Sequence, residues 1–148
     1  MKAIWILVVN QAEAQIYSAK RLSGSLVLVD TLVNVDGAAH ARDLVSDAPG
    51  RVHDRMGTTR HAMEQDTGVK EEIRRRFVKE VVGYLKAANL RGDFCELVLL
   101  AAPAILGVIR KSMTEQLSKS VVKVISKDVI GQDMDKIRKQ LDRAFELK

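Results

Sequence analysis

The chain has 148 residues, of which 47% are hydrophobic, so it is long enough for a single buried core and too apolar for a disordered chain. No apolar run reaches the roughly 18 residues of a membrane span, and the apolar N-terminal stretch is short for a signal segment, so we expect a cytoplasmic protein without membrane contact. Lys and Arg number 24 against 19 Asp and Glu, and the net charge of +5 mildly favours polyanionic partners.

Three apolar segments in the first part of the chain predict β-strands. Residues 3–10 are β-branched and aliphatic, as expected for a strand that is covered on both faces. Residues 14–19 follow after a short polar turn, and residues 26–35 form a third apolar run with strand propensity. Because the links are short, the three strands are expected to form an antiparallel meander.

Between residues 37 and 68 the pattern changes, and we expect a long polar loop. Apolar periodicity is lost, while Gly, Pro, His, Asp and Arg accumulate; only residues 38–45 could form a short helix. A connection of this length is unusual in a compact domain unless it is functional. This loop is therefore the first place to look for function.

The second half of the chain predicts alternating helices and strands. Apolar positions recur at helical spacing from residue 69 to 89, and Gly92 ends that helix. Strands are expected at 94–101 and 121–126, with a helix opened by Pro103 and running to about residue 119 between them. A strand, a helix and a strand in this order make a parallel crossover. The last helix, 132–147, should turn four side chains inward: Met134, Ile137, Leu141 and Phe145.

Together these elements predict one α/β domain over residues 1–148, with a five-stranded mixed sheet flanked by helices. The lone cysteine, Cys95, excludes an intramolecular disulfide and a cysteine-based metal cluster, and is expected to be a buried strand residue. The common motifs for nucleotide binding and serine hydrolysis are absent, and the first strand ends in Asn10 rather than a carboxylate, which disfavours a two-metal nuclease. No cofactor is expected.

The segment from Ser46 to Glu64 could bind phosphate groups. Its glycines allow backbone amides to approach an anion, and three arginines supply bidentate donors: Arg51, Arg55 and Arg60. Four residues would shape the loop: Asp47, Pro49, Gly50 and Asp54. The alternative, a solvated loop whose Asp and Arg residues pair with each other, is equally open. Aromatic residues are only 4% of the chain, so any nucleic-acid contact should be mainly to phosphates.

The three histidines, His40, His53 and His61, lie near carboxylates in the same segment. A general acid/base pair can be drawn from His61 and Glu64, which are the candidate catalytic residues. The spacing supports a metal site poorly, and none is expected. Histidines that only pack or face solvent are the alternative.

A second candidate phosphate contact follows the buried strand at 94–101. A helix that starts directly after a strand presents amides and a dipole that favour an anion, and Arg110 and Lys111 lie about two turns further on. The alternative for this helix is simple packing through Leu106, Gly107 and Ile109. We keep Arg110 and Lys111 as candidate phosphate contacts.

Four motifs occur in a recognisable order: Ser46–Arg51, Arg60–Glu64, Ala101–Arg110 and Ile125–Asp128. In this order they resemble the bacterial host-attachment protein family, over nearly the whole chain. That family is similar in architecture to the middle domain of archaeal and eukaryotic peptide-chain release factors, which has an RNase H-like fold. The resemblance implies a role in translation, with the ribosome, tRNA or another RNA as partner.

In those release factors a Gly-Gly-Gln tip reaches the ester of peptidyl-tRNA, and residues 50–64 take the same topological place here. This chain has no Gly-Gly-Gln, and Gln65 lacks the paired glycines, so ester hydrolysis by that mechanism is not expected. The leading hypothesis is a ribosome- or RNA-associated factor that uses residues 47–64. Two alternatives remain: a non-catalytic protein-interaction factor that affects attachment, and a hydrolase that uses a histidine and a carboxylate. The oligomeric state is open.

Overall fold

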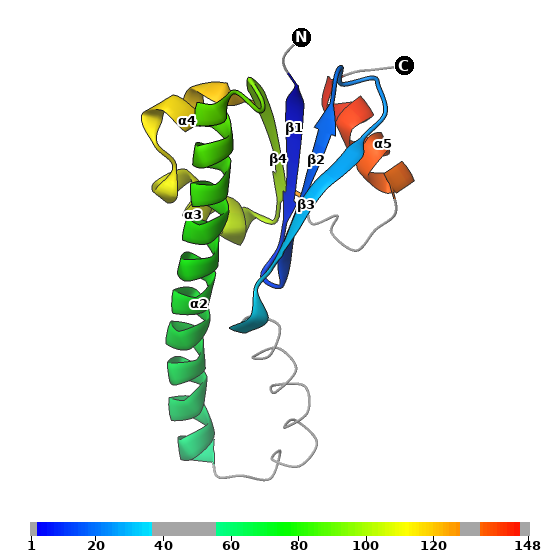
Figure 1. The fold of residues 1–148 in the computed structure, drawn as a ribbon. Helices are drawn as coiled ribbons and strands as arrows, with labels where there is room; N and C mark the ends of the chain where they lie inside the picture. The colour runs from blue at the N-terminus through cyan, green and yellow to red at the C-terminus, as the bar shows by residue number, and fades with distance from the viewer. Residues whose placement is uncertain (1–2, 37–55, 128–133, 146–148) are drawn as a thin grey trace.

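The protein forms a five-stranded mixed sheet flanked by helices, as the sequence predicts (Figure 1). The structure is a computed structural model that describes residues 3–36, 56–127 and 134–145, with side chains from residue 68 onward in the second range. The strand order is β3-β2-β1-β4-β5, with antiparallel pairing from β3 to β1 and parallel pairing from β1 to β5. The strands are β1 (Ile4–Val9), β2 (Glu13–Ala19), β3 (Val27–Val33), β4 (Glu96–Ala101) and β5 (Val121–Ile125).

Strand β1 lies at the centre of the sheet, and all six of its residues are buried. This explains why its sequence is continuously apolar rather than alternating: helices cover both of its faces. The turn into β2 is fixed by Asn10, whose Oδ1 accepts hydrogen bonds from the backbone N–H groups of Ala12 (2.7 Å) and Glu13 (2.9 Å). A side chain that satisfies two amides of a turn holds the hairpin in register.

Two layers of helices cover the sheet (Figure 1). On one face lie α2 (Met56–Arg91), α3 (Pro103–Ser112) and α4 (Glu115–Ser120), and on the other lies α5 (Met134–Phe145). The first face buries a cluster in which the Trp5 ring stacks on Phe94, with centroids 4.8 Å apart. The second face buries Ile137 and Leu141 of α5 against β1, β2, β4 and β5.

Helix α2 begins at Met56, not at Val69, so the prediction of a loop up to residue 68 is wrong from residue 56 onward. The remaining part of that prediction, residues 37–55, lies outside the described residues. In Figure 1 the first turns of α2 extend past the end of the sheet. The sequence of residues 56–67 carries no apolar stripe, so its pattern does not predict a helix there. The other end is as predicted: Gly92, at φ +84°, follows the last helical residue.

The single helix predicted over residues 103–119 is two helices. Met113 and Thr114 adopt extended backbone angles and separate α3 from α4. The Thr114 hydroxyl accepts a 3.2 Å hydrogen bond from the N–H of Leu117, and Glu115 occupies the first turn. Threonine followed by an acidic residue is a helix-start signal, and it overrides the apolar spacing that runs through this segment.

Two further expectations need correction. Met134 is 40% exposed rather than turned inward, since it is the first residue of α5 and lies beyond the sheet contact made by Ile137 and Leu141. Cys95 is half-buried and precedes β4 rather than belonging to it. Its N–H donates a 3.0 Å hydrogen bond to the carbonyl oxygen of Ala3. Phe145 is partly buried against the α5 cluster, as expected.

Candidate functional site

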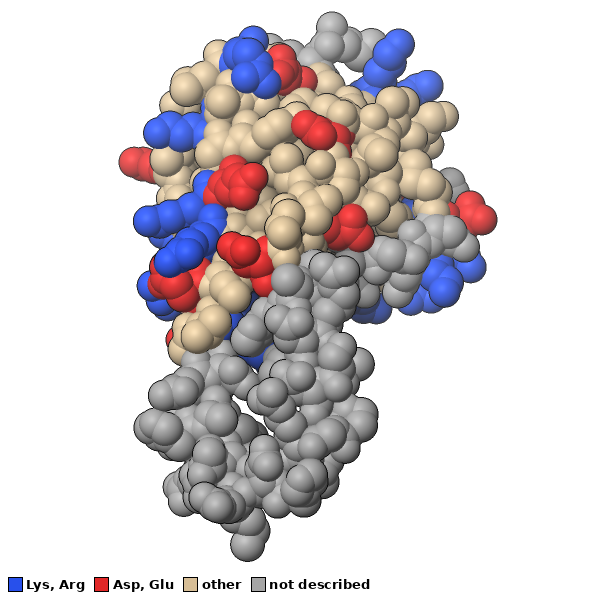
Figure 2. Space-filling view, turned by 60° about the horizontal axis from the view of Figure 1, so that its bottom comes forward, with Lys and Arg blue, Asp and Glu red and all other residues tan. Residues whose placement is uncertain are grey.

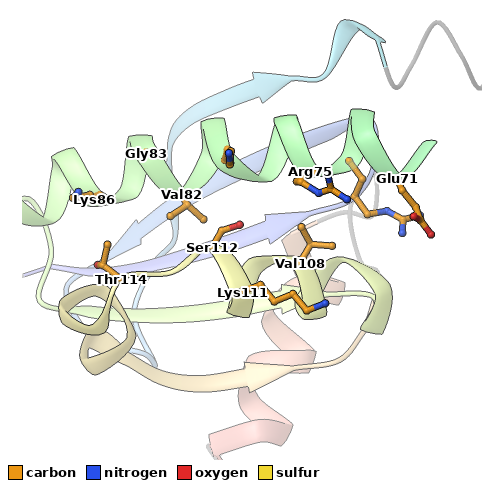
Figure 3. Close-up of a pocket in the computed structure, with 11 residues that line it drawn as sticks. Glu71, Arg75, Val82, Gly83, Lys86, Val108, Lys111, Ser112 and Thr114 are labelled. Carbon is orange, nitrogen blue, oxygen red and sulfur yellow. The ribbon is translucent and has the colours of Figure 1, made fainter. Parts of the chain in front are cut away.

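A groove of about 780 Å³ lies between α2 and α3 (Figure 3). Most of the charged side chains that line it are basic: Arg74, Arg75, Lys79 and Lys86 of α2 and Lys111 of α3. The lining also includes one carboxylate, Glu71, the apolar surface of Val82, Gly83 and Val108, and the hydroxyls of Ser112 and Thr114. We call this the α2–α3 groove. Its charge balance suits an anionic ligand.

The basic residues share one face of α2 because of their spacing. Intervals of four or seven residues bring side chains to the same side of a helix, and they separate Arg75, Lys79 and Lys86. The acidic residue Glu71 lies four residues before Arg75 on the same side. The neighbouring face carries the apolar residues that pack on the sheet: Phe77, Val78, Val81, Val82, Leu85 and Ala88. At 1.5 Å of rise per residue, the basic stretch from Arg74 to Lys86 extends for about 18 Å.

Arg74 is half-buried, whereas the other four cations of the groove are exposed. Its Nε is buried and has no hydrogen-bond partner. Nearly all buried N–H groups in proteins are paired, and an exception calls for a ligand, an ion or a water as the missing acceptor. Arg74 as a whole is half-buried where it lines the groove, so its charge is less screened by solvent than that of an exposed arginine.

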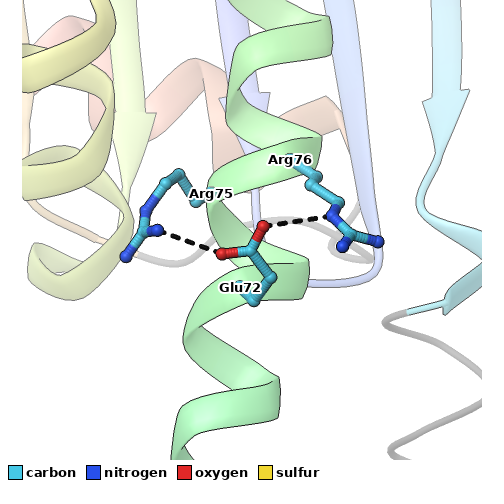
Figure 4. Close-up of polar contacts among 3 residues, drawn as sticks. All are labelled: Glu72, Arg75 and Arg76. Carbon is cyan, nitrogen blue, oxygen red and sulfur yellow. Dashed lines mark hydrogen bonds and ion pairs between the residues drawn. The ribbon is translucent and has the colours of Figure 1, made fainter.

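Arg75 and Arg76 share a single carboxylate, that of Glu72 (Figure 4). Arg75 Nη1 lies 3.0 Å from Oε2 and Arg76 Nε lies 3.1 Å from Oε1. The arginine side chains are 58% and 71% exposed, so these ion pairs are screened by solvent and easily exchanged. Arg75 lines the groove whereas Arg76 does not.

The opposite wall of the groove is the end of α3. Lys111 and Ser112 are the last two residues of this helix, and Val108 lies one turn before Lys111. A cation in the last turn of a helix interacts favourably with the helix dipole, so Lys111 is stabilised there as well as facing the groove. Across the groove, Gly83 has no side chain, and a Cβ added at this position would meet no atom within 4 Å. The groove is therefore open at Gly83.

Two of the predicted phosphate-binding residues have side chains that the structure describes, and one of these two lies at the groove. Lys111 lines it, whereas its neighbour Arg110 is exposed and is not part of the lining. Arg60, His61 and Glu64 lie on α2, in the part whose side chains are not described. The remaining predicted loop residues lie outside the described residues: Asp47, Pro49, Gly50, Arg51, His53, Asp54 and Arg55. Their roles stay predictions.

Sequence reasoning identified Lys111 but missed the other four cations of the groove: Arg74, Arg75, Lys79 and Lys86. A signal for them existed, because they recur on one side of the apolar stripe of the long helix. What the sequence could not give was the partner surface, since Lys111, Ser112 and Thr114 reach the same groove from a distant part of the chain.

The charge is unevenly distributed over the surface. Figure 2 shows a face whose centre is largely uncharged, with separate acidic groups, while Lys and Arg gather towards its margins. Among the side chains that the structure describes, no three His, Cys, Asp or Glu residues lie together in a way that could hold a metal ion. The three histidines are not among those side chains. Within the described ranges, no helix combines the length and the hydropathy needed to cross a membrane.

The fold and the groove define an α/β protein with a basic groove between two helices. Residues 5–141 match a family described as "Protein required for attachment to host cells", so the chain belongs to this host-attachment family. The predicted family resemblance is thus confirmed. The likeness to release factors and the RNase H-like label are not tested by this match and stay predictions.

Proteins similar to this chain include a curated sequence and a solved structure. An uncharacterized protein of Rickettsia prowazekii (strain Madrid E) is 27% identical over 78 residues, which are 51% of this chain and 52% of that protein. The chain thus matches about half the length of this curated relative. A solved structure described as an archaeal protein has a TM-score of 0.52 and 14% identity, covering 98% of this chain and 34% of that one. At this identity the likeness shows the fold alone.

Proposed function

We propose that this host-attachment-family protein is a ribosome- or RNA-associated factor that holds an RNA phosphate backbone in the α2–α3 groove. The observation that carries this proposal is the set of five cations facing one carboxylate, with the buried Nε of Arg74 unpaired. Positive charges in a groove attract a polyanion, and a half-buried guanidinium is screened less by solvent than an exposed one.

The length of the basic stretch favours a polymer over a single small anion. Arg74 and Lys86 are separated by about 18 Å of helix, and Lys79 lies between them. One phosphate cannot reach both ends, whereas a nucleic-acid strand can place successive phosphates along the groove. None of the described lining residues is aromatic, so the contacts would be to the backbone rather than to stacked bases.

The N-terminal part of α2 would extend this contact. Arg60 lies on the same helix as Arg74, and Arg51 and Arg55 precede the helix in the chain. Residues 47–64 would approach the RNA-containing partner, with His61 and Glu64 orienting this segment or transferring a proton. A release-factor-like role in translation and a cytoplasmic location belong to the same proposal.

The test is co-sedimentation with ribosomes from a lysate at low and raised salt. The variant Lys79→Ala/Lys111→Ala removes two charges from the groove, and the control Lys119→Ala/Lys139→Ala removes two exposed charges elsewhere. We expect salt-sensitive co-sedimentation that the groove variant loses and the control keeps. Absence of the wild-type protein from the ribosome fraction at both salt concentrations, together with no binding to free RNA, would refute the proposal.

A second candidate function, protein interaction, is favoured by the edge of the sheet. Strand β3 pairs only with β2 among the described strands, and it exposes Val27 (63%), Leu28 (51%) and Val33 (57%). An exposed apolar edge strand is a place where another chain can add a strand. A partner captured from nuclease-treated lysate by the wild-type protein, and lost on Leu28→Lys, would favour this function over RNA binding.

A further inference from the structure

The geometry points to Ser112 as the residue that lets the α2–α3 groove distinguish RNA from DNA, by hydrogen bonding to a ribose 2′-hydroxyl. This inference rests on the proposed function, because it needs a nucleic-acid strand in the groove. It adds the sugar as a recognised group, where the cations recognise only phosphate. Phosphate contacts alone cannot separate RNA from DNA, whereas the 2′-hydroxyl can.

The position of Ser112 within the groove suits a contact to the sugar. In Figure 3 its hydroxyl points towards α2 near Val82, with Arg75 towards one end of the groove and Lys86 towards the other. Phosphates held by these cations on either side would leave the intervening sugars facing the middle of the groove. Ser112 is half-buried there, so its hydroxyl is partly shielded from competing water.

The hydroxyl of Ser112 is also free to bind. It makes no hydrogen bond with any residue that the structure describes, so both its donor and its acceptor capacity are available. The other hydroxyl in the groove is Thr114, whose oxygen already accepts the N–H of Leu117 as the cap of α4. A 2′-hydroxyl can donate and accept, and Ser112 matches both properties.

The groove leaves space for a sugar beside Ser112. Gly83, in the opposite wall, presents no side chain, and the space around its missing Cβ is open to 4 Å. Val82 and Val108 supply apolar surface that suits the C–H groups of a ribose ring. A deoxyribose at the same place would set a C–H group against the hydroxyl and leave it unpaired in a partly desolvated site, which disfavours DNA.

The experiment compares two labelled oligonucleotides of equal length, an oligouridylate and an oligodeoxyuridylate, by fluorescence anisotropy at low salt. The two differ only at the 2′ position, so base contacts cancel. We expect the full chain to bind the RNA about 3- to 10-fold more tightly than the DNA, the range of one hydrogen bond. Ser112→Ala should weaken RNA binding, and it should relieve the cost of the unpaired hydroxyl for DNA, so that the two affinities become equal.

The control is Ser118→Ala, which removes an exposed hydroxyl outside the groove and should keep the RNA preference. Alanine is a good helix former, so Ser112→Ala should fold, and circular dichroism checks this. Equal, salt-sensitive binding of RNA and DNA by the wild-type chain would overturn the role of Ser112 while leaving the proposed function standing. An RNA preference that survives Ser112→Ala would do the same. Failure of both oligonucleotides to bind would refute the groove as a nucleic-acid site as well.

Discussion

The Glu72 carboxylate lies 3.0 Å from the guanidinium of Arg75, at the end of the α2–α3 groove where Arg75 and Arg74 line it. The same carboxylate binds Arg76 at 3.1 Å, so one acidic residue partly neutralises two basic ones. An anion that enters the groove must compete with Glu72 for Arg75. Glu72 should therefore weaken phosphate binding at the proposed site.

Glu72→Gln should therefore strengthen binding to an oligouridylate, by about 2- to 5-fold at low salt, because it removes a competing negative charge beside the phosphates. Anisotropy titrations measure the change, and raised salt should diminish it. Stability should fall by no more than about 1 kcal/mol, as expected for the loss of two exposed helical ion pairs. The matched control is Glu115→Gln, which breaks an ion pair with Lys119 outside the groove. Equal effects of the two substitutions would contradict the groove as the binding site.

Arg110 and Lys111 are adjacent, equally charged residues that differ in their location relative to the groove. Lys111 lines the groove and Arg110 does not, so the two alanine variants have the same net charge and differ in place. Lys111→Ala should weaken RNA binding about 3- to 10-fold and lower the salt dependence by about one phosphate contact. Arg110→Ala should change the affinity by less than about twofold, which is the effect of net charge alone. A larger loss for Arg110→Ala, measured in the same titration, would move the phosphate contact off the groove.

The buried strands and the buried part of α2 could be predicted because burial leaves a hydrophobic pattern in the sequence. The continuous apolar run of β1 and the stripe of α2 from Phe77 to Ala88 are both consequences of contact with a core. The start of α2 at Met56 escaped prediction because residues 56–67 carry no apolar stripe, and both helical and loop backbones are compatible with such a polar sequence. The break before Thr114 was hidden by apolar spacing that continues across it.

The groove was only partly accessible to sequence reasoning. Lys111 was identified from its place after a buried strand, but Arg74, Lys79 and Lys86 read equally well as a solvated helix face. What makes them a site is that α3 packs against the side of α2 on which they lie. This relationship is set by tertiary packing between segments that are distant in sequence. The local periodicity of the sequence therefore does not predict it.

Few buried side chains pack helix α5 against the sheet, so a single substitution can test how much this packing contributes to stability. Leu141 is fully buried in a cluster with Ile137, Ile6 and Leu100. Leu141→Ala should lower the free energy of unfolding by about 2–5 kcal/mol, since it removes buried apolar surface and leaves a cavity. Urea denaturation followed by circular dichroism measures this. The control Met134→Ala, at a position that is 40% exposed on the same helix, should cost less than about 1 kcal/mol.

Alkaline pH should destabilise the protein through its two tyrosines. Burial is the main cause that raises the pKa of Tyr84, and a hydrogen bond with Asp30 adds to it. Burial also raises the pKa of Tyr17, helped by the negative charge of Glu13. Below pH 10, the ordinary pKa of tyrosine, both side chains are protonated in the folded and the unfolded chain, and their contribution to stability is fully present.

Above pH 10 the unfolded chain loses these protons first, while the folded chain keeps them until its higher pKa is reached. The folded state then binds more protons than the unfolded state, so the free energy of unfolding falls as pH rises. Urea denaturation in steps from pH 8 to pH 11 should show this decline in the wild-type protein. Tyr17→Phe/Tyr84→Phe removes both tyrosines of the chain and should decline less steeply, whatever its stability at neutral pH. If the two proteins lose stability in parallel above pH 10, other groups cause the decline and the tyrosines do not.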